Sequence, residues 1–533
     1  MKAGLCFKKI LTLLMTTLLF FLCGCGGNGN TEHSQNKLVE YENQNESAVQ
    51  GGILRLAMTD VQTLQPVVCK NQHNLYVYKL IFDSLFVTAP NHSIEPVLCE
   101  NYIVSPDGLT YTFQMKHGVS FHNGARFTAN DVEATLSMIM STDGLYRQRL
   151  SCISAYSSQG MSLTISLHYP VINFPALLDF PIMSRDDIST GANEYVPNGT
   201  GRYKVQSYKK SKELHLSHNE NYHQDFSPYI SDITVYLLNN AETAVSMLET
   251  MQIDVLPSGV INLHEYTPKR SLSSTEFFGG KFTFLGINNQ HPAFLTPLTR
   301  HALASSINRQ DLLADCAIQY ASEAFLPLPQ NSFWHKPTTE NFTHDVNLAR
   351  QLLVDDGWID KDSNGILEKE VYGEQISLTF NILVNEENQN RQKIAEQLKE
   401  HYQEIGIPVT IISTSFGDYE ARIAERNYDL FIGEIDFSQN FDLSFLLKTN
   451  ENYFGISNER LDQILNALYL QDSELSKQSL FYELCDVLSE EVPIIGLFYE
   501  YEQLIFDQRV RGSITPSYSD IFYGIEGWFL YVK

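Results

Sequence analysis

The chain has 533 residues, of which 43% are hydrophobic and 19% charged. This length exceeds what one compact core supports, so we expect two or more domains, and the composition is that of a folded protein. The formal net charge of −26 disfavours nucleic acid as a partner, because an acidic surface repels phosphate groups.

The N-terminus has the pattern of an export signal. Lys2, Lys8 and Lys9 precede an apolar run that ends at Leu22. Positive charge followed by a short apolar core is typical of a secretory signal peptide, and the run is short for a stable membrane span. We predict that residues 1–24 are a signal peptide and that the protein lies on the extracytoplasmic side of the cell membrane, at the cell surface or in the periplasm.

The predicted signal ends in Leu22-Cys23-Gly24-Cys25. This sequence resembles the bacterial lipobox, in which a small residue precedes a cysteine that receives diacylglycerol. Gly24 makes Cys25 the better candidate for lipidation. The alternative is an ordinary signal peptide that happens to contain cysteines. The resemblance implies a lipid anchor at Cys25. Such an anchor would hold the chain firmly, because each methylene buried in the bilayer contributes about 0.8 kcal/mol.

Residues 25–50 are predicted to form a lipidated flexible tether. They are rich in Gly, Asn, Gln, Glu and Ser and show no apolar periodicity. The cysteines that follow are widely scattered, and no Cys-x-x-Cys occurs, which argues against a zinc or thioredoxin-like site. We therefore expect buried free thiols, no metal site and no cofactor.

The folded body is predicted to begin at Gly51 and to alternate strands with helices. Ser105-Pro106-Asp107-Gly108 is a strong turn signal between two arms of a hairpin. Thr128 is a plausible N-cap with Asp131 three residues on, and Gly406 is a helix end. Strand–helix–strand units favour an α/β body with partly parallel sheets. The patterns predict strands at 53–57, 109–115, 282–287, 376–384, 408–412 and 428–432, and helices at 76–86, 300–313, 345–353 and 388–405.

A series of short motifs occurs in a specific order from Gly51 to Val132. The motifs are Gly-Gly-x-Leu-Arg at 51–55, Thr-Leu-Gln-Pro at 63–66, Ile-Phe-Asp-Ser-Leu-Phe at 81–86, Ser-Pro-Asp-Gly-Leu-Thr-Tyr-Thr-Phe at 105–113 and Phe-Thr-Ala-Asn-Asp-Val at 127–132. The series resembles the bacterial extracellular solute-binding proteins of family 5, which include oligopeptide-, dipeptide- and nickel-binding proteins. The resemblance covers nearly all of residues 51–533, although Arg202 stands where the family usually has proline.

The resemblance implies an α/β, two-lobe periplasmic-binding-protein-like fold of type II, in the large cluster with an extra subdomain. Lobe 1 is expected at 51–280, with an inserted subdomain at about 84–190. Lobe 2 is expected at 281–504, and residues 505–533 return to lobe 1. The lobes are joined by a hinge, and their closure would bury the solute.

The resemblance also implies a function. The chain is expected to be a monomeric substrate-binding lipoprotein of an ABC importer, which captures oligopeptides or dipeptides in an interlobe cleft and delivers them to permease subunits. The family has no catalytic residues, so we expect no enzyme. Nickel or another small solute, and a peptide-sensing receptor, are alternatives within the fold. An exported hydrolase is disfavoured because G-x-S-x-G, H-E-x-x-H and P-loop motifs do not occur in the sequence.

In peptide-binding members the partner of the peptide ammonium lies just after the strand that corresponds to residues 428–432. Many members have Gly-Trp there and an aspartate shortly after, whereas this chain has glutamate in place of the tryptophan. Asp436 is the candidate ammonium partner, Ser438 could occupy that place instead, and solvated turn residues at Asp436 and Asp442 are the alternative. The expected ligand-contacting residues are Gly433, Glu434, Ile435, Asp436 and Phe437.

One further loop resembles a metal site. Asp360-Lys361-Asp362-Ser363-Asn364-Gly365 has the start of a calcium loop, but its twelfth position is Val371 rather than glutamate. A full EF-hand is therefore excluded. We interpret the segment as an acidic hairpin turn.

Overall fold

The computed structural model describes residues 38–43, 47–190, 194–261, 266–316, 320–337 and 342–531. The predicted signal peptide and the lipidation candidate Cys25 lie outside these ranges. Strands and helices alternate along the described chain, and its sheets contain parallel as well as antiparallel neighbours. The predicted α/β class with partly parallel sheets is confirmed.

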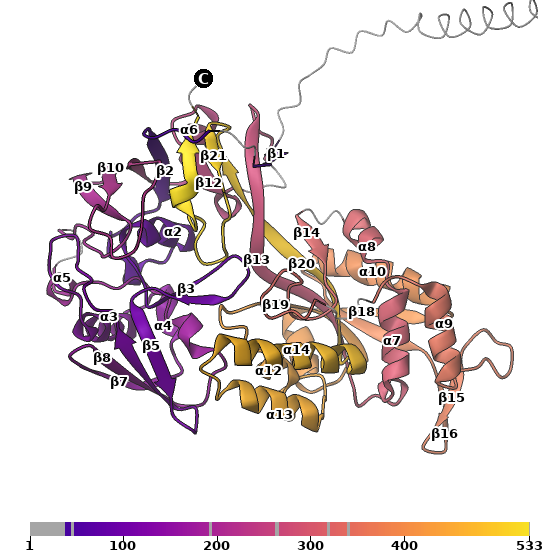
Figure 1. Cartoon of the computed structure of the whole chain (residues 1–533). Coiled ribbons are helices and arrows are strands. Elements are labelled where there is room, and N and C mark those ends of the chain that lie inside the picture. The colour runs from indigo at the N-terminus through magenta and orange to yellow at the C-terminus, as the bar shows by residue number, and fades with distance from the viewer. Residues whose placement is uncertain are drawn as a thin grey trace, which may run out of the picture.

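The largest sheet has eight strands and runs through the middle of the molecule (Figure 1). Six strands follow the order β12-β20-β13-β19-β17-β18, while β1 pairs with β13 and β14 pairs with β20. The longest strands of this sheet, β13 (Leu272–Ile287) and β20 (Ile494–Phe506), are antiparallel to each other. The others are β1 (Leu38–Glu40), β12 (Val255–Pro257), β14 (Ala321–Glu323), β17 (Phe380–Asn385), β18 (Val409–Thr414) and β19 (Leu430–Asp436).

Among the described residues, the part that we call lobe 1 contains two four-stranded sheets, with the strand orders β2-β11-β10-β9 and β5-β6-β8-β7, and the two-stranded sheets β3-β4 and β21-β22. In Figure 1 it is coloured indigo to magenta, and the yellow C-terminal segment returns to it. Its strands are β2 (Ile53–Thr59), β3 (Phe86–Thr88), β4 (Ile94–Pro96), β5 (Cys99–Val104), β6 (Thr110–Met115), β7 (Ile153–Gln159), β8 (Ser162–Leu167), β9 (Tyr203–Lys209), β10 (Glu213–His218), β11 (Asp232–Leu238), β21 (Val510–Gly512) and β22 (Trp528–Leu530). Its helices are η1 (Pro66–Val68), α2 (Gln72–Ile81), α3 (Ala129–Ser141), α4 (Leu145–Arg149), η2 (Phe174–Leu177), α5 (Arg185–Ile188), α6 (Ala241–Glu249), η3 (Ser258–Val260) and η5 (Ile525–Gly527).

The part that we call lobe 2 surrounds β17, β18 and β19, of which β17 is parallel to both neighbours. Helices cover these strands, and the hairpin of β15 and β16 projects from the end of the lobe (Figure 1). Its other elements are η4 (Pro292–Phe294), α7 (Pro297–Ser306), α8 (Arg309–Asp315), α9 (Val346–Asp355), β15 (Glu368–Val371), β16 (Glu374–Ser377), α10 (Gln389–Glu404), α11 (Phe416–Ala424), α12 (Ser444–Leu447), α13 (Glu459–Leu468) and α14 (Glu474–Glu491).

Strands β13 and β20 run from one lobe into the other. The register of β13 against β20 shifts between Phe278 and Lys281. The shift contains Gly280, whose φ is +85°, and a Cβ atom there would lie 2.8 Å from the Tyr518 ring. Glycine therefore permits both the backbone conformation and the close approach. The boundaries expected at 280 and 504 fall within these two strands, and they stay predictions.

Several local features follow directly from the sequence. The side chains of Thr128 and Asp131 form a capping box at the start of α3, as the spacing predicts. Gly406, with φ of +82°, follows the end of α10. The predicted single helix at 300–313 is wrong, because α7 ends at Ser306 and the Asn308 side chain caps a second helix, α8.

The N-terminal segment differs from its prediction as a flexible tether over residues 25–50. Residues 38–40 form β1, which lies parallel to β13 at Leu272–Ser274. The Tyr41 hydroxyl bonds to both the N–H and the carbonyl of Gly512, each at 2.9 Å. Its ring lies 5.3 Å from Phe506. The tether prediction is therefore wrong at residues 38–41, because this apolar and aromatic stretch pairs with an available strand edge.

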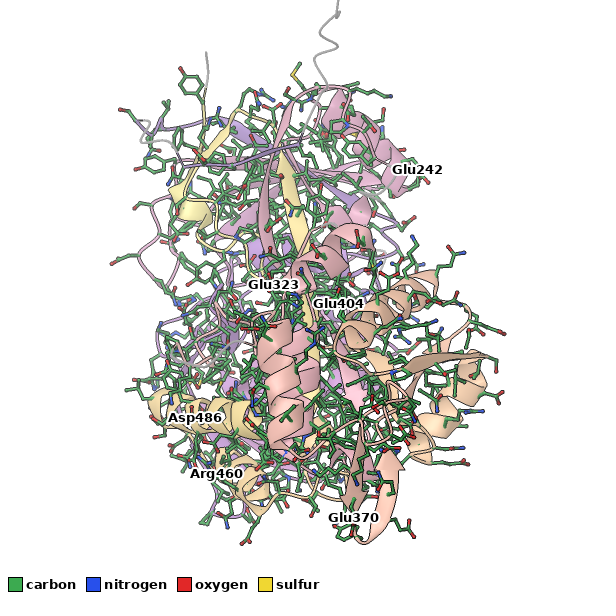
Figure 2. The ribbon with its side chains drawn as sticks, turned by 90° about the vertical axis from the view of Figure 1, so that its right-hand side faces the viewer. Glu242, Glu323, Glu370, Glu404, Arg460 and Asp486 are labelled. Atoms are coloured by element: carbon green, nitrogen blue, oxygen red, sulfur yellow. The ribbon has the colours of Figure 1, made fainter. Side chains whose placement is uncertain are left out.

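One contiguous cluster of buried apolar side chains extends through both lobes. The described cysteines, at positions 69, 99, 152, 316 and 485, are buried, and those at 69, 99, 152 and 316 are free thiols, as expected. None of the helices formed by the described residues combines the length and the apolar character needed to cross a bilayer. The acidic charge is spread over the surface, and Figure 2 shows Glu242, Glu323, Glu370, Glu404 and Asp486 on different elements of one face.

Candidate functional site

The predicted binding segment begins inside β19. Gly433 is buried and lies opposite Phe284 of β13. A Cβ atom at Gly433 would lie 2.5 Å from the Phe284 ring, so the close packing of these strands requires glycine here. From this point the strand carries Glu434, Ile435 and Asp436 to the place where β13 and β20 pass between the lobes.

Charged side chains line one face of the sheet at this crossing. Lys281 of β13 lies opposite Asp436 on one side and opposite Glu500 of β20 on the other. Its Nζ atom is 3.6 Å from a carboxylate oxygen of Glu434. Burial alone would lower the pKa of Lys281, but the three carboxylates raise it above its ordinary value. This charged face is therefore predominantly acidic.

Glu502, two residues after Glu500 in β20, is a carboxylate of this region that sequence reasoning missed. One of its carboxylate oxygens is buried and has no hydrogen-bond partner in the part of the chain that the structure describes. Burial raises the pKa of Glu502, and Lys281 offsets this effect only in part. The signal was the alternation Tyr499-Glu500-Tyr501-Glu502, because every second residue of a strand lies on the same face.

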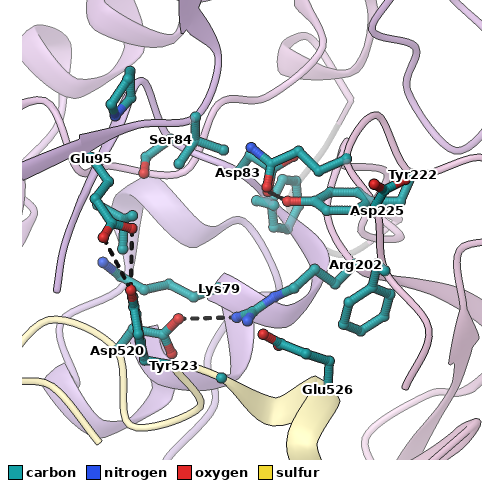
Figure 3. A pocket seen from close by; sticks show the side chains of 17 residues that line it. Lys79, Asp83, Ser84, Glu95, Arg202, Tyr222, Asp225, Asp520, Tyr523 and Glu526 are labelled. Atoms are coloured by element: carbon teal, nitrogen blue, oxygen red, sulfur yellow. Dashed lines mark hydrogen bonds and ion pairs between the residues drawn. The ribbon is translucent and has the colours of Figure 1, made fainter. Parts of the chain in front are cut away.

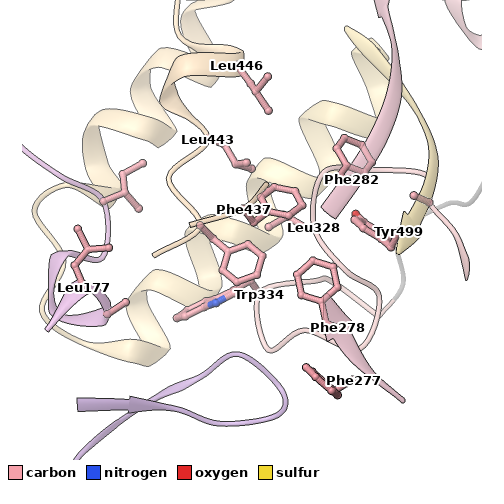
Figure 4. Close-up of a cluster of buried hydrophobic side chains, with 14 of the residues drawn as sticks. Leu177, Phe277, Phe278, Phe282, Leu328, Trp334, Phe437, Leu443, Leu446 and Tyr499 are labelled. Carbon is pink, nitrogen blue, oxygen red and sulfur yellow. The ribbon is translucent and has the colours of Figure 1, made fainter. Parts of the chain in front are cut away.

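The opposite face of the same strands is aromatic. Phe437 is 4% exposed, and its ring centre lies 5.8 Å from Phe282 and 6.1 Å from Phe278. The Tyr499 ring lies 5.2 Å from Phe282. Figure 4 shows these rings gathered in one cluster, with Leu177 of lobe 1 at its edge. The aromatic face therefore belongs to the buried contact between the lobes.

The loop after β19 also reaches lobe 1 through polar groups. The Gln439 side chain donates to Asp179 at 2.7 Å and accepts from Arg149 at 3.0 Å. The Asn440 side chain donates to the backbone carbonyl of Ile172 at 2.8 Å. These bonds hold the segment that follows the predicted ligand contacts directly against lobe 1.

Asp179 is the centre of a buried charged group. Its carboxylate lies 2.6 Å from Arg149 and 3.2 Å from Lys79. Burial would raise the pKa of Asp179, but the two cations lower it below its ordinary value. Gln439 of lobe 2 therefore meets a buried, ionised group of lobe 1. Loss of one partner from this group would leave buried charge uncompensated.

The structure places the five predicted contact residues in two environments. Glu434 and Asp436 are exposed on the charged face, Ile435 is half-buried, and Gly433 and Phe437 are buried. The Asp436 carboxylate makes no hydrogen bond to any residue of the described ranges. The structure thus brings Glu434 and Asp436 together beside Lys281, whereas Phe437 turns into the aromatic cluster.

The two alternative positions have partners of their own. Ser438 is exposed, and its hydroxyl donates to the Asn440 side chain. The Asp442 carboxylate accepts from the backbone N–H of Ser444 at 2.9 Å and of Ile172 at 3.4 Å. Burial raises the pKa of Asp442. Asp442 is therefore a structural acceptor in the interlobe contact rather than a solvated turn residue.

The acidic loop near residue 360 is a turn. The Asp360 carboxylate accepts from the backbone N–H of Asn364 at 3.1 Å and of Gly365 at 2.9 Å. No set of three or more His, Cys, Asp or Glu side chains suited to a metal ion occurs among the described residues. These contacts fit the interpretation of the loop as an acidic hairpin turn.

A separate cavity of about 220 Å³ lies within lobe 1 (Figure 3). Arg202, the residue that departs from the family's proline, lines this cavity and pairs with Asp520 at 3.0 Å. The Tyr523 hydroxyl bonds to Glu95 at 3.2 Å. All of its lining residues belong to lobe 1, so this cavity is distinct from the junction between the lobes.

Comparison with known proteins shows the same architecture over most of the chain. Oligopeptide-binding protein AppA of Bacillus subtilis is 23% identical over 550 residues, covering 98% of each chain. Nickel-binding protein NikA of Staphylococcus aureus is 23% identical over 448 residues, covering 81% of this chain and 86% of its own. The solved structure of MppA, a periplasmic murein tripeptide binding protein in its unliganded open form, has a TM-score of 0.73 at 16% identity and covers 91% of this chain and 98% of its own.

These structural likenesses confirm the expected two-lobe periplasmic-binding-protein-like fold. The family described as bacterial extracellular solute-binding proteins, family 5 (middle region) matches residues 93–455. The match spans more than half of the chain and includes β19 with the predicted binding segment. The chain therefore belongs to the family 5 bacterial extracellular solute-binding proteins.

Proposed function

We propose that the chain is the substrate-binding lipoprotein of an ABC importer, which captures oligopeptides or dipeptides between its lobes and delivers them to permease subunits. The family consists of extracytoplasmic substrate-binding proteins of transporters, so we propose no catalytic activity. The relative AppA, named an oligopeptide-binding protein, aligns with 98% of this chain, which supports a peptide as the solute. We propose hinge closure about β13 and β20, near residues 280 and 504, and a monomeric state.

The observation that carries the peptide proposal is the exposed carboxylate of Asp436 at the junction of the lobes. Burying a peptide removes its terminal ammonium and its amides from water, at about 1–3 kcal/mol for each group left unpaired. A peptide-binding cleft therefore needs a carboxylate for the ammonium. Asp436 supplies one, and Glu434 and Glu500 add negative potential that Lys281 neutralises only in part.

Calorimetric titration of the full chain with a peptide and with its N-acetylated form tests this role. Asp436→Asn should weaken binding of the free-amine peptide at least tenfold, or about 1.4 kcal/mol, and should leave binding of the acetylated peptide unchanged. Glu370→Gln, in the distant β15–β16 hairpin, is the matched control. If Asp436→Asn binds the free-amine peptide within about threefold of the original chain, Asp436 is not the partner, and Ser438→Ala becomes the variant to examine.

The anchor has its own test. We propose that residues 1–24 are removed and that diacylglycerol on Cys25 holds the chain at the outer face of the cell membrane. Cys25→Ala should abolish incorporation of radiolabelled fatty acid and release the protein from the membrane fraction. A variant that stayed membrane-bound and labelled would disprove lipidation at Cys25.

Nickel or another small solute is the alternative within the same fold, because NikA aligns with 81% of this chain. Native mass spectrometry of protein purified without refolding would identify the solute that co-purifies. A peptide-sensing receptor differs from an importer in uptake, so labelled-peptide uptake in a strain that lacks the protein separates these roles. Turnover in a peptide-hydrolysis screen would favour the least supported alternative, an exported hydrolase.

A further inference from the structure

His92 lies in the tight turn between β3 and β4 of lobe 1 and is buried at the contact with lobe 2. It is 2% exposed. Its φ is +64°, a left-handed backbone conformation that non-glycine residues adopt infrequently. A histidine in such a conformation needs surrounding contacts that hold it there. The His92 N–H donates to the Ala89 carbonyl within the turn at 2.8 Å, and further contacts come from the other side of the junction.

Residues outside the turn contact both the ring and the backbone of His92. The imidazole lies 5.1 Å from Phe278 of the crossing strand β13 and 5.1 Å from Phe441 in the loop after β19. The Trp334 indole N–H donates to the His92 carbonyl at 3.1 Å. Figure 4 shows Trp334 in the same cluster as Phe278 and Phe437. The His92 ring of lobe 1 thus packs inside an aromatic cluster that includes residues of lobe 2.

The surroundings of this ring are apolar. Its Nε2 atom is buried and has no hydrogen-bond partner among the described residues. Phe278 and Phe441 face the ring, and its neighbours in the turn, Asn91 and Ser93, do not ionise. Burial lowers the pKa of His92 from 6.5 to about 4, and no charged group of the described chain contributes to the shift.

Two ionisable residues adjoin the contacts of the ring in the chain. Asp442, next to Phe441, accepts from the backbone N–H groups of Ser444 and Ile172, and burial lowers the pKa of His335, next to Trp334. Tyr499, Tyr501 and Tyr518 pack against Phe278. Glu95, three residues beyond His92, is exposed and bonds to the Tyr523 hydroxyl. An imidazolium at position 92 would therefore have no anion beside it in the docked state.

We propose that His92 is a pH-sensitive latch between the lobes, which holds them together while its imidazole is neutral and releases them when it is protonated. The sign follows from burial, because the docked state binds the neutral ring and separated lobes expose it to water. Docking is then strongest above the ordinary pKa of 6.5 and weakens as the pH falls towards about 4. These two values predict that docking weakens about 25-fold between pH 7.5 and pH 5.

Protonation of His92 would also affect the loop that follows the predicted ligand contacts. Phe441 rests on His92, and the same loop carries Gln439 and Asn440, which bond to lobe 1. Loss of the His92 contact frees one end of this loop. Weaker solute retention in an acidic medium is the expected result, and only this clause rests on the proposed function.

Distance measurements between two spin labels test the latch without any solute. Gln159 in lobe 1 and Glu420 in lobe 2 are exposed and accept cysteine substitutions for labelling, since the native cysteines of the described ranges are buried. In the otherwise unchanged chain, lowering the pH from 7.5 to 5 should move population from the distance of the docked state to longer ones. An unchanged distance distribution over this range would overturn the proposal.

Two variants separate titration from packing. His92→Phe keeps an aromatic ring in the contact but fits the left-handed backbone less well, so its docking should be somewhat weaker and the same at both pH values. His92→Asn tolerates the left-handed backbone, does not titrate, and should weaken docking equally at both. His117→Asn, at an exposed histidine, is the control and should respond to pH like the unchanged chain. If His92→Phe opened at the same pH as the unchanged chain, another group would be the latch.

Failure of the latch and failure of the peptide proposal are distinguishable. Lobe separation is measured with no peptide present, so a negative result with Asp436→Asn leaves it intact. Conversely, peptide titrations at pH 7.5 do not depend on protonation of His92. Comparison of peptide affinity at pH 7.5 and pH 5 in His92→Phe then shows whether the latch governs solute retention.

Discussion

The two faces of the sheet at the crossing between the lobes have opposite characters. One face carries Lys281 among Glu434, Asp436 and Glu500, and much of it is exposed. The other face carries aromatic rings such as Phe437, which are buried against lobe 1. Both faces come from the same three strands, because successive side chains of a strand point to opposite sides.

One short segment of β19 and the loop after it contributes to both faces. The acidic face carries the carboxylates that we propose as solute contacts, while the aromatic face packs in the buried contact between the lobes. Asp436 and Phe437 are adjacent in the chain yet belong to different faces. Substitutions on the two faces should therefore affect different quantities, and the following variants test this separation.

The largest loss of stability is expected from Phe437→Ala. Phe437 contacts Phe278, Phe282 and Phe441, and truncating a buried phenylalanine typically costs about 3–5 kcal/mol. Urea denaturation followed by tryptophan fluorescence measures the loss. The adjacent Asp436→Ala, on the exposed face, should change the free energy of unfolding by less than about 0.5 kcal/mol. Equal losses in the two variants would contradict the division between the faces.

Asp179→Asn is expected to have the next largest effect. It leaves Arg149 and Lys79 without their shared carboxylate in a buried place, and loss of one partner from such a group costs about 3 kcal/mol. The measurement is the midpoint of thermal unfolding by circular dichroism at pH 7. Asp143→Asn, in an exposed pair with Lys70, is the control and should leave the midpoint unchanged.

Gly433→Ala should cost about 1–3 kcal/mol, because the added methyl group meets the Phe284 ring at 2.5 Å. Gly417→Ala adds the same methyl group where no neighbouring atom lies within 4 Å. Denaturation curves of the two variants compare strand packing at the crossing with an open surface. A Gly433→Ala chain as stable as Gly417→Ala would show that β13 and β19 adjust without strain.

The smallest effect, a gain below about 1 kcal/mol, is expected from Glu502→Gln at pH 7. The pKa of Glu502 is raised in the folded chain, so folding favours its protonated form. Stability therefore declines as the pH rises from the ordinary value of 4.5 through the raised value. The glutamine variant lacks this decline, and its advantage should vanish near pH 4 in thermal unfolding scans. An advantage independent of pH would point to packing instead of ionisation.

Much of the local structure was predictable because its causes are local. The turn at Ser105–Gly108, the cap at Thr128 and the stop at Gly406 depend on residues a few positions apart. The break between α7 and α8 was not predicted, because the cap that separates them depends on the side-chain conformation of Asn308. Propensity and periodicity alone did not locate this boundary.

The candidate site was predictable only in part. The position of the segment after β19 followed from the family resemblance, and the structure brings Glu434 and Asp436 to the crossing. The partners of that segment could not be predicted from the sequence. His92 and Phe441 are far apart in the chain and meet only where the lobes are in contact.

The pairing of β1 with β13 shortens the tether between the folded body and the proposed lipid anchor. A fully extended chain from Cys25 to Leu38 spans at most about 45 Å. A tether that extended to Gly51 would span at most about 90 Å. The shorter tether ends at β1, which pairs with a strand that passes between the lobes. A force from the proposed membrane anchor would then act on β13 at Leu272–Ser274, in the same strand as the hinge that we propose near residue 280.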